Sequence, residues 1–559
     1  MATRAELGQW YTPPRVASLV IRLAIEGLGP KPRILDPSCG DGVFFRSAIE
    51  MGVDPIQMVG IELDKDAASE ATKSGAEIVS GSLFDDLDQN KKLLRPSSFD
   101  AIVGNPPYVR QERLSKEFKS EIARSLDSFC AFWDDSLITK LLGRGDLAVF
   151  CLLRTIGFAK PGARLVFVLS SALLDASYAK IFWEMVGSNC RVLAILDSPK
   201  ERWFSDAAIK AMIVVLEKKE VVGDGASGSV LVARFPENVK NIESRIHSLG
   251  DVERLFPSRK VSQNKPEHWK VALRAHPTWF SFSEAAREFL VPLSELAEIK
   301  RGMTTGANSI FYLSQKTIDA WCIEEELLLP LFRVPRNRSV TNIKILPEEL
   351  PLRVLLAPKE RSRLECFPGA TAYIDSHTEN VVSSTLKARN PWWALSARPA
   401  NLFLTKAYGV RFAQYFCDRG IVADQRVYGL YPKGGVSSFL LAAIMNSTFT
   451  AFALESLGRA SMGHGALEWT VGDAESLPVV DIRKLDKRKI ALIEKSFNSM
   501  LQEPIGDVLT ESTNIRRQKL DSVILECLPF FKGGTAAIYE ALISAVSMRN
   551  DGSGSTDSN

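Results

Sequence analysis

The stretch Asp100-Ala101-Ile102-Val103-Gly104-Asn105-Pro106-Pro107-Tyr108 reads as a short apolar strand that ends abruptly in a polar, proline-rich turn. Each proline lacks an N–H and has a fixed φ, so the turn is stiff and offers carbonyl oxygens with few competing donors. An amide, two carbonyls and an aromatic face suit a planar base that carries an amino group. Alone, such a tetrapeptide is more often a loop breaker than a site, so the residues upstream decide its meaning.

Strand-like apolar runs precede this stretch, and each one ends in a polar or glycine-containing turn. They cover residues 33–35, 58–61 and 78–79, and the run at 101–103 delivers Asn105. Four strand-helix units in a row predict an α/β fold with a doubly wound, Rossmann-like parallel sheet, whose strand tips form one crevice.

The first turn, Asp36-Pro37-Ser38-Cys39-Gly40-Asp41-Gly42, lies where the backbone of such a sheet approaches a ligand. It matches neither Gly-x-Gly-x-x-Gly nor a phosphate loop, and an acid at the strand end would repel phosphates. Glu62, at the tip of the second strand, is placed to accept hydrogen bonds from two ribose hydroxyls. Near the start of the chain, Thr12 can cap a helix over residues 15–27, and Pro13 suits its first turn.

Four motifs in this order resemble the gamma-type, TaqI-like DNA adenine-N6 methyltransferases of restriction-modification systems. The motifs are Tyr11-Thr12-Pro13-Pro14, the turn that begins at Asp36, Glu62, and Asn105 to Tyr108. The resemblance implies S-adenosylmethionine as the cofactor. It implies that Tyr11, Thr12 and Pro13 flank the methionine end, that Asp36, Ser38 and Gly40 surround the amino and sulfonium region, and that Glu62, with Leu63 beside it, takes the ribose.

The chain departs from the family at the contact to the cofactor adenine. Where the family usually has an acid, this chain has Ser82, and Asp85 three residues later is the alternative partner. The resemblance further implies that Phe204 stacks on an extruded base together with Tyr108, although a phenylalanine at a strand entry is also a common core residue. In this interpretation Asn105 and Pro106 accept hydrogens from the target amine, and Pro107 stiffens the turn.

The remainder of the first half predicts a polar insertion at 109–145, an apolar helix at 147–158 and strands at 164–169 and 192–196. Residues 208–217 and 229–235, joined by a Gly-Asp-Gly turn, predict a terminal antiparallel hairpin. We therefore expect a catalytic domain at 1–240.

The second half predicts a connector at 241–289, a β-rich α+β target-recognition domain at 290–480, a helical segment at 481–549 and a disordered tail at 550–559. Short motifs that contain basic, aromatic or amide side chains resemble blocks of the TaqI-type recognition domain. They begin at Arg301, Arg389, Lys406, Asp424 and Met445, and a basic glycine-rich turn follows at 458–465. Arginine and amide side chains can read base edges, but no single residue is assigned to a base.

Composition limits the function classes. The chain of 559 residues is 46% hydrophobic and 24% charged with a net charge of +3, which describes a globular protein whose nucleic-acid surface must be local. The eight cysteines form no Cys-x-x-Cys pair, so neither a disulfide framework nor a metal site is expected. No apolar run is long enough for a membrane helix, and we expect a cytoplasmic monomer without membrane contact.

These observations predict a site-specific methyltransferase that acts on adenine N6 in double-stranded DNA, with a separate cognate endonuclease as a candidate partner. Three alternatives remain: N4-cytosine methylation, glutamine N5 methylation of a release factor, and a specificity subunit without catalysis. The DNA recognition sequence is not readable from the chain.

Overall fold

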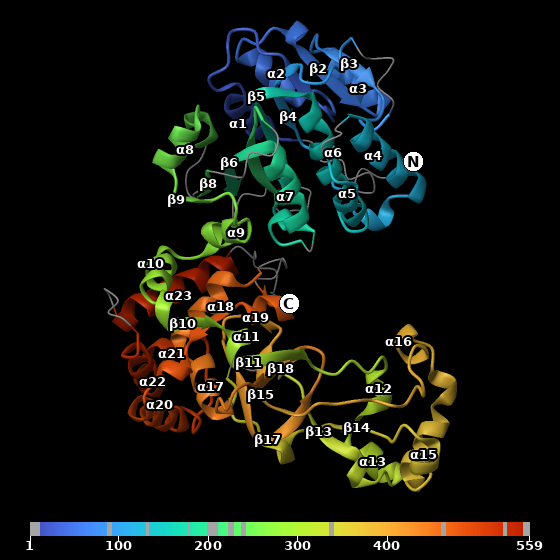
Figure 1. Ribbon diagram of the computed structural model, residues 1–559, viewed down its shortest axis with the longest axis vertical. Coiled ribbons are helices and arrows are strands. Elements are labelled where there is room, and N and C mark those ends of the chain that lie inside the picture. The colour runs from blue at the N-terminus through green and yellow to red at the C-terminus, as the bar shows by residue number, and fades with distance from the viewer. Residues whose placement is uncertain are drawn as a thin grey trace, which may run out of the picture. The chain divides into compact units, whose positions relative to one another are not determined.

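A computed structural model describes residues 12–85, 92–129, 133–176, 178–197, 211–221, 228–235, 242–334, 340–459, 466–528 and 534–551. The chain divides into two units, residues 1–274 and 275–559 (Figure 1). The division falls inside the segment expected as a connector.

Within the described residues, the first unit contains one sheet of nine strands in the order β3-β2-β1-β4-β5-β7-β6-β8-β9. The strands are β1 Ile34–Asp36, β2 Met58–Glu62, β3 Glu77–Ser80, β4 Phe99–Gly104, β5 Ala159–Ser170, β6 Cys190–Asp197, β7 Ala211–Lys218, β8 Ser229–Arg234 and β9 Ser258–Ser262. The helices are α1 Pro14–Ile25, α2 Val43–Glu50, α3 Lys65–Thr72, α4 Lys116–Phe129, α5 Asp135–Leu142, α6 Leu147–Thr155, α7 Ala179–Asn189, α8 Leu249–Leu255 and α9 Glu267–Arg274.

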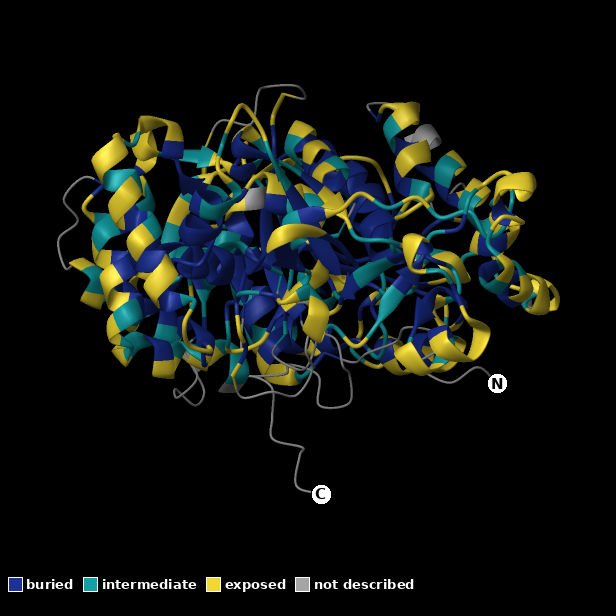
Figure 2. Cartoon of the chain, turned by 90° about the horizontal axis from the view of Figure 1, so that it is seen from below, coloured by how far each residue is buried: buried dark blue, intermediate teal, exposed yellow. Residues whose placement is uncertain are grey.

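The strands from β3 to β5 are parallel, as predicted, and their side chains alternate between two cores. Ala101 and Val103 of β4 pack in one core with α1 and α2, whereas Ile102 packs in the other with α6 and α7. Buried residues are dark blue in Figure 2. A parallel sheet buried on both faces is the expected doubly wound α/β arrangement, so the α/β prediction is confirmed.

The predicted terminal hairpin is wrong. β7 lies between β5 and β6 and pairs antiparallel with both, while β8 pairs parallel with the opposite edge of β6. Seven of the eight β7 residues are buried, and a strand of that kind takes a place inside a sheet with a neighbour on each side. β9, from the expected connector, extends the same sheet beyond β8.

The first helix also differs from its prediction. α1 begins at Pro14, with Pro13 as an extended N-cap that makes no side-chain cap hydrogen bond. Thr12 therefore does not cap α1. Its hydroxyl oxygen instead accepts a hydrogen bond from the Asn105 side chain.

For the described part of the second unit, the main sheet has seven strands in the order β11-β18-β15-β17-β13-β14-β12. The strands of this unit are β10 Leu290–Pro292, β11 Ala297–Arg301, β12 Tyr312–Leu313, β13 Leu328–Phe332, β14 Arg353–Leu355, β15 Ala400–Thr405, β16 Ala407–Tyr408, β17 Tyr415–Ala423, β18 Val427–Pro432, β19 Leu467–Glu468 and β20 Pro478–Val480.

The helices of this unit precede, interrupt and follow these strands along the chain. They are α10 Pro277–Ala285, α11 Leu293–Leu296, α12 Asn308–Phe311, α13 Gln315–Trp321, α14 Arg361–Leu364, α15 Pro368–Ser376, α16 Ser384–Lys387, α17 Ser438–Met445, α18 Thr448–Leu457, α19 Val471–Glu475, α20 Lys487–Met500, α21 Val508–Thr513, α22 Ile515–Leu525 and α23 Gly534–Asp551. In the part of the chain that is described, no single helix is long and apolar enough to cross a membrane; α17 and α18 reach that length only as a pair bent by 64°.

Candidate functional site

The predicted site residues of the first unit lie at neighbouring strand tips. Asp36 is the last residue of β1, Glu62 is the last residue of β2, and Asn105 follows β4 directly. β1 pairs in parallel with both β2 and β4, so all three tips are at the carboxyl edge of the sheet. The structure therefore brings the predicted cofactor turn and the Asn-Pro-Pro-Tyr turn to one edge, where α/β sheets bind ligands.

The Glu62 side chain links the tip of β2 to the glycine turn that follows β1. Its Oε2 accepts a hydrogen bond from the Gly40 N–H at 2.8 Å, and its Oε1 accepts one from the Asp64 N–H at 2.8 Å. Gly40 and Gly42 have φ values of 53° and 81°, a conformation that favours glycine. The sequence predicted Glu62 as a ribose ligand, but it did not predict that this side chain shapes the glycine turn.

Asp36 is fully buried at the start of the glycine turn. Its Oδ1 accepts a hydrogen bond from the Ser38 N–H at 3.1 Å. Its Oδ2 and the Ser38 Oγ are buried and make no hydrogen bond within the described residues. Burial raises the pKa of Asp36 to about 8; the hydrogen bond from Ser38 lowers it in part, and the charges of Glu62 and Asp41 raise it.

These groups fit a ligand that brings a positive charge and hydrogen-bond donors. A cation beside Asp36 would favour its charged form, and donors would satisfy the buried oxygens. Asp41 was not assigned to the site by the sequence. Its Oδ1 is another buried oxygen with no hydrogen bond to a described residue. The signal available in the sequence was its position between two glycines, both of which are left-handed in the structure.

The turn after β3 contains both candidates for the adenine contact. The Asp85 carboxylate accepts a hydrogen bond from the Ser82 N–H at 2.7 Å, and the Ser82 hydroxyl accepts one from the Phe84 N–H at 3.1 Å. The Gly81 N–H donates to the Glu62 carbonyl, which joins this turn to the tip of β2. Leu63 is 71% exposed at that tip, so its side chain is available to pack against a planar group.

The Asn-Pro-Pro-Tyr turn is held on both sides. The Asn105 side chain donates from Nδ2 to the Thr12 Oγ1 at 3.1 Å, and the Tyr108 hydroxyl donates to the Val168 carbonyl at 3.1 Å. Burial raises the pKa of Tyr108, so its hydroxyl stays neutral and keeps this hydrogen bond. Pro106 is buried, and Pro107 is partly buried. The turn is therefore held in one position and contains one aromatic ring, that of Tyr108.

The segment that follows the turn is anchored to α6. The Leu147 N–H donates to the Val109 carbonyl at 2.9 Å. The neighbouring Asp146 accepts a hydrogen bond from the Tyr178 hydroxyl at 3.0 Å, and burial raises the pKa of Asp146. The sequence did not indicate these anchors, since they join segments that carry no recognisable motif.

Two predicted site residues, Tyr11 and Phe204, lie outside the described residues. β6 ends at Asp197 and β7 begins at Ala211 on either side of the stretch that contains Phe204. The roles of both residues stay predictions.

In the second unit, three of the predicted recognition motifs meet at one edge of the sheet. Arg301 ends β11 opposite Tyr428, and Val427 of β18 pairs with Thr405 at the end of β15. The Lys406 N–H donates to the Arg426 carbonyl at 3.1 Å. We call Arg301, Lys406, Gln425 and Arg426 the recognition edge.

Backbone contacts determine the shape of the recognition edge. A Cβ on Gly302 would lie 2.1 Å from the Asp424 carbonyl oxygen, so only glycine fits there. The Arg301 guanidinium donates to the Gln425 carbonyl and to its Oε1, both at 3.4 Å. Asp424 is buried and pairs with Arg333 at 3.4 Å, which leaves arginine and amide groups at the surface.

The glycine-rich basic turn joins the same region. Arg459 pairs with Glu468 by backbone hydrogen bonds, and the Trp469 N–H donates to the Lys406 carbonyl at 2.8 Å. The Arg459 guanidinium also forms an ion pair with Asp473 at 2.8 Å. Residues 460–465 of this turn lie outside the described residues.

The other two motifs have structural contacts. Arg389 donates to the Trp392 and Thr305 carbonyls at 3.1 and 3.0 Å and lies over the Phe311 ring, and burial lowers its pKa. Asn446 is buried and exchanges hydrogen bonds with the backbone of Gln414. These contacts hold loops and strands in place, so we do not assign either residue to ligand binding.

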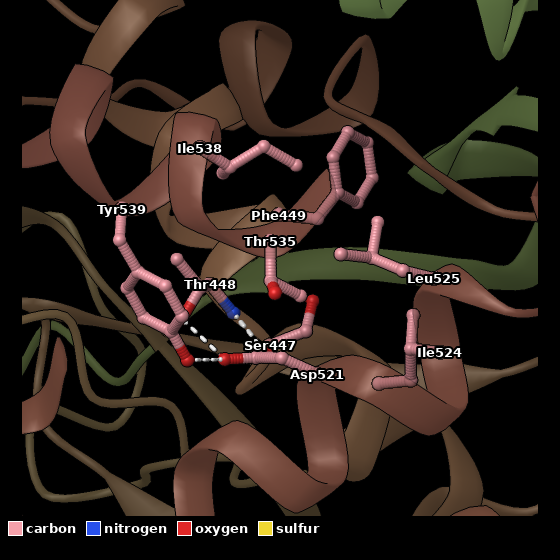
Figure 3. Close-up of a pocket in the computed structure, with 9 residues that line it drawn as sticks. All are labelled: Ser447, Thr448, Phe449, Asp521, Ile524, Leu525, Thr535, Ile538 and Tyr539. Atoms are coloured by element: carbon pink, nitrogen blue, oxygen red, sulfur yellow. Dashed lines mark hydrogen bonds between the residues drawn. The ribbon is translucent and has the colours of Figure 1, made fainter. Parts of the chain in front are cut away.

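A small pocket among the C-terminal helices, shown in Figure 3, is also structural. Asp521 accepts hydrogen bonds from the Thr448 N–H and hydroxyl at 2.7 and 2.6 Å and from the Tyr539 hydroxyl. Burial raises the pKa of Asp521, whose carboxyl group joins the start of α18 to α22 and α23. Throughout the described ranges, no group of three or more His, Cys, Asp and Glu residues could hold a metal ion.

Comparison with known proteins matches both units to restriction-modification methylases. Residues 61–204 match the family described as Eco57I restriction-modification methylase, and residues 276–513 match the C-terminal domain of type II methyltransferase M.Eco57I.

Curated relatives cover most of the chain. Type II methyltransferase M.BanIII of Aneurinibacillus aneurinilyticus is 24% identical over 513 residues, covering 80% of this chain and 84% of the relative. Type II methyltransferase M.AccI of Acinetobacter calcoaceticus is 22% identical over 512 residues, covering 87% of each. Among solved structures, the type IIL restriction-modification enzyme MmeI, determined in complex with DNA, aligns with a TM-score of 0.51 at 14% identity, covering 96% of this chain and 71% of that one. The last likeness shows the fold alone.

Proposed function

We propose that this chain, which is similar to type II restriction-modification methyltransferases over most of its length, transfers a methyl group from S-adenosylmethionine to the N6 of adenine in a specific duplex DNA sequence. The observation that carries the proposal is the position of the Asn105 turn. It lies at the same sheet edge as the buried acidic crevice of Asp36 and Glu62. One edge thus carries buried acidic groups that suit a positively charged ligand and a side-chain amide that suits an amine.

S-adenosylmethionine suits the crevice group by group. The buried carboxyl of Asp36 and the Ser38 hydroxyl would take the α-ammonium end, and the Glu62 carboxylate has further lone pairs for the ribose hydroxyls. Leu63 would cover the adenine, and Ser82 or Asp85 would meet its amino group. When bound, this cofactor supplies a methyl group that is activated by a positive sulfur.

The chain's own residues would prepare the acceptor. The lone pair of an exocyclic amine is delocalised into the ring, which makes the amine a poor nucleophile. Hydrogen bonds from the amine to the Asn105 Oδ1 and the Pro106 carbonyl draw the nitrogen toward sp³ and aim its lone pair. Neither acceptor is a strong base, so the proton leaves to water after transfer.

The target base must leave the helix to reach this edge. Flipping costs a few kcal/mol, which stacking on aromatic side chains can offset. Tyr108 provides one face, and its hydroxyl is fixed to Val168. Phe204 is our candidate for the other face.

Contact with DNA is proposed for the recognition edge. Arg301 and Arg426 are exposed, and the Gln425 amide lies against Arg301. Guanidinium groups bind phosphates and guanine edges, and glutamine pairs with adenine in the major groove. We further propose that the enzyme works as a monomer in the cytosol, with a separate endonuclease as its partner in restriction.

The test is methyl transfer from labelled S-adenosylmethionine to unmethylated genomic DNA, with protein substrates as a parallel arm. The wild-type chain and the Asn264→Ala control should label DNA equally, since Asn264 is exposed and distant in sequence from every motif. Asn105→Ala should not label it. Label in protein but not in DNA would indicate a glutamine methyltransferase, and no transfer would leave only a DNA-binding role.

A further inference from the structure

One arginine of the second unit, Arg333, lies beside the recognition edge but belongs to none of the predicted motifs. Arg333 follows β13 directly, and Asp424 follows β17, which runs parallel to β13. The Asp424 N–H donates to the Phe332 carbonyl at 3.1 Å, which joins the two strand ends. On its other side Asp424 pairs with Met303, two residues after Arg301. Arg301 and Arg333 therefore flank the same turn.

The Asp424 carboxylate beside Arg333 is held in a fixed position. Asp424 is only 3% exposed. Its Oδ1 accepts a hydrogen bond from the Arg426 N–H at 2.8 Å, and its Oδ2 forms an ion pair with the Arg333 Nε at 3.4 Å. Both oxygens thus have partners, and turning the carboxylate would leave a buried charge unpaired.

The Arg333 backbone is fixed to the core, whereas the end of its side chain reaches the surface. Phe332, the residue before it, is buried, and its ring centre lies 5.4 Å from that of Phe403 and 4.9 Å from that of Tyr415. The Arg333 side chain is 42% exposed. Its Nε faces the carboxylate, and its two terminal nitrogens make no hydrogen bond to any residue that the structure describes. A planar pair of N–H donors is therefore left for an external partner.

The Asp424 charge distinguishes the two kinds of DNA group that a guanidinium binds. A phosphate is an anion, so the buried carboxylate would repel it, and salt screens such a charge only weakly. The O6 and N7 atoms of guanine are uncharged acceptors, and their spacing fits the two terminal nitrogens of arginine. Arg301, by contrast, contacts the uncharged Gln425 and keeps its full positive charge. The Arg333 environment therefore suits a guanine edge better than a phosphate.

We infer that Arg333 reads a guanine of the recognition sequence, and that Asp424 is a positioning residue that orients its guanidinium. The inference rests on the proposed function, which assigns DNA contact to the recognition edge. It adds a base-reading residue to the four residues that define that edge.

The test measures the sequence preference of DNA binding by the full chain. Bound duplexes are selected from a randomised pool and sequenced. Arg333→Lys keeps the charge, but its single ammonium group stays on Asp424 and offers no planar pair of donors. Arg419→Lys is the matched control, because Arg419 also lies on β17 but pairs at 3.7 Å with Glu348, and both side chains are mostly exposed.

We expect the wild-type chain and Arg419→Lys to select the same sequence, which contains a G·C pair. In Arg333→Lys the preference for that pair should fall about 10-fold to 100-fold, the range expected for one bidentate contact, with the other positions unchanged.

Asp424→Asn tests the positioning role, since it removes the charge and keeps an oxygen for the Arg426 N–H. Its preference for the same G·C pair should fall by a smaller factor. Its affinity for non-specific DNA should rise at low salt and depend more steeply on salt, because the Arg333 charge is no longer neutralised. A purely structural ion pair would not produce that change.

Unchanged selectivity in Arg333→Lys would overturn the inference and leave the ion pair a structural contact. A uniform loss of affinity across all sequences, or a selected sequence without a G·C pair, would overturn it as well. A wild-type chain that selects a DNA sequence without methylating it would overturn the proposed reaction but not this inference, whereas a chain that binds no DNA would overturn both.

Discussion

The crevice of the first unit and the recognition edge of the second unit are built in different ways. In the crevice, each functional group stands at the end of its own parallel strand, so a short motif in the sequence is also a place in the fold. At the recognition edge, residues from β11, β15 and the turn before β18 meet through backbone contacts between distant segments. The proposed catalytic residues thus belong to short motifs that are local in sequence, whereas the proposed recognition residues come together from distant segments of the chain.

The largest effect should come from Asn105→Ala. We expect methylation to fall by at least about 1000-fold, because both orientation and hydrogen bonding of the amine are lost. Binding of S-adenosylmethionine, measured by calorimetry, should be retained because Asp36 and Glu62 are untouched. A mutant that methylates at the wild-type rate would sink the assignment of Asn105.

Gly302→Ala should remove recognition while sparing the crevice. The added Cβ would lie 2.1 Å from the Asp424 carbonyl, so β11 and the turn before β18 must separate. Overpacking of this kind costs about 1–3 kcal/mol or more. We expect loss of DNA binding in a mobility-shift assay with S-adenosylmethionine binding intact.

Gly472→Ala is the control, since a Cβ there meets no atom within 4 Å. If Gly302→Ala bound DNA normally, the recognition edge would have to be placed elsewhere in the unit.

Arg301→Ala should weaken DNA binding by about 10-fold, the loss expected for one guanidinium contact. If the contact is to a phosphate, the slope of log affinity against log salt should fall by about 1. Arg361→Ala is the matched control, because Arg361 is also partly exposed but forms a two-point ion pair with Asp375. Equal losses in both variants would point to general charge rather than to the recognition edge.

The smallest expected effect is the release of a proton from Asp36 when the cofactor binds. In the free protein its pKa is raised to about 8, so the carboxyl is largely neutral at pH 7. A bound cation lowers that pKa, so binding should release a proton and affinity should rise with pH until about 8. Calorimetry in two buffers of different ionisation enthalpy measures the release, and Asp36→Asn should lose this component. Proton uptake on binding would contradict the assignment.

The sequence predicted the first region well because its signals are local. Apolar runs such as 58–61 and 101–103 end in polar or glycine turns, and a parallel sheet brings those ends to one edge. It did not predict the neighbours of β7 and β8, since strand pairing depends on which sheet edges are already occupied. It also missed the Thr12 contact to Asn105, which joins residues 93 positions apart.

The sequence predicted several recognition motifs in the second half, but it could not distinguish exposed residues of these motifs from structural ones. Arg301 and Arg389 look alike as isolated arginines, yet the first is at an exposed edge and the second is held by backbone carbonyls beside Phe311. Only tertiary contacts distinguish them. Roles for Tyr11 and Phe204 stay predictions from the family resemblance.

The most direct test of the central claim is the identity of the methylated nucleoside. Unmethylated genomic DNA is incubated with the protein and S-adenosylmethionine, digested to nucleosides, and analysed by mass spectrometry. N6-methyladenine at one recurring sequence is the predicted product, absent with Asn105→Ala. Detection of N4-methylcytosine, or of no methylated nucleoside after incubation with the wild-type chain, would contradict the account.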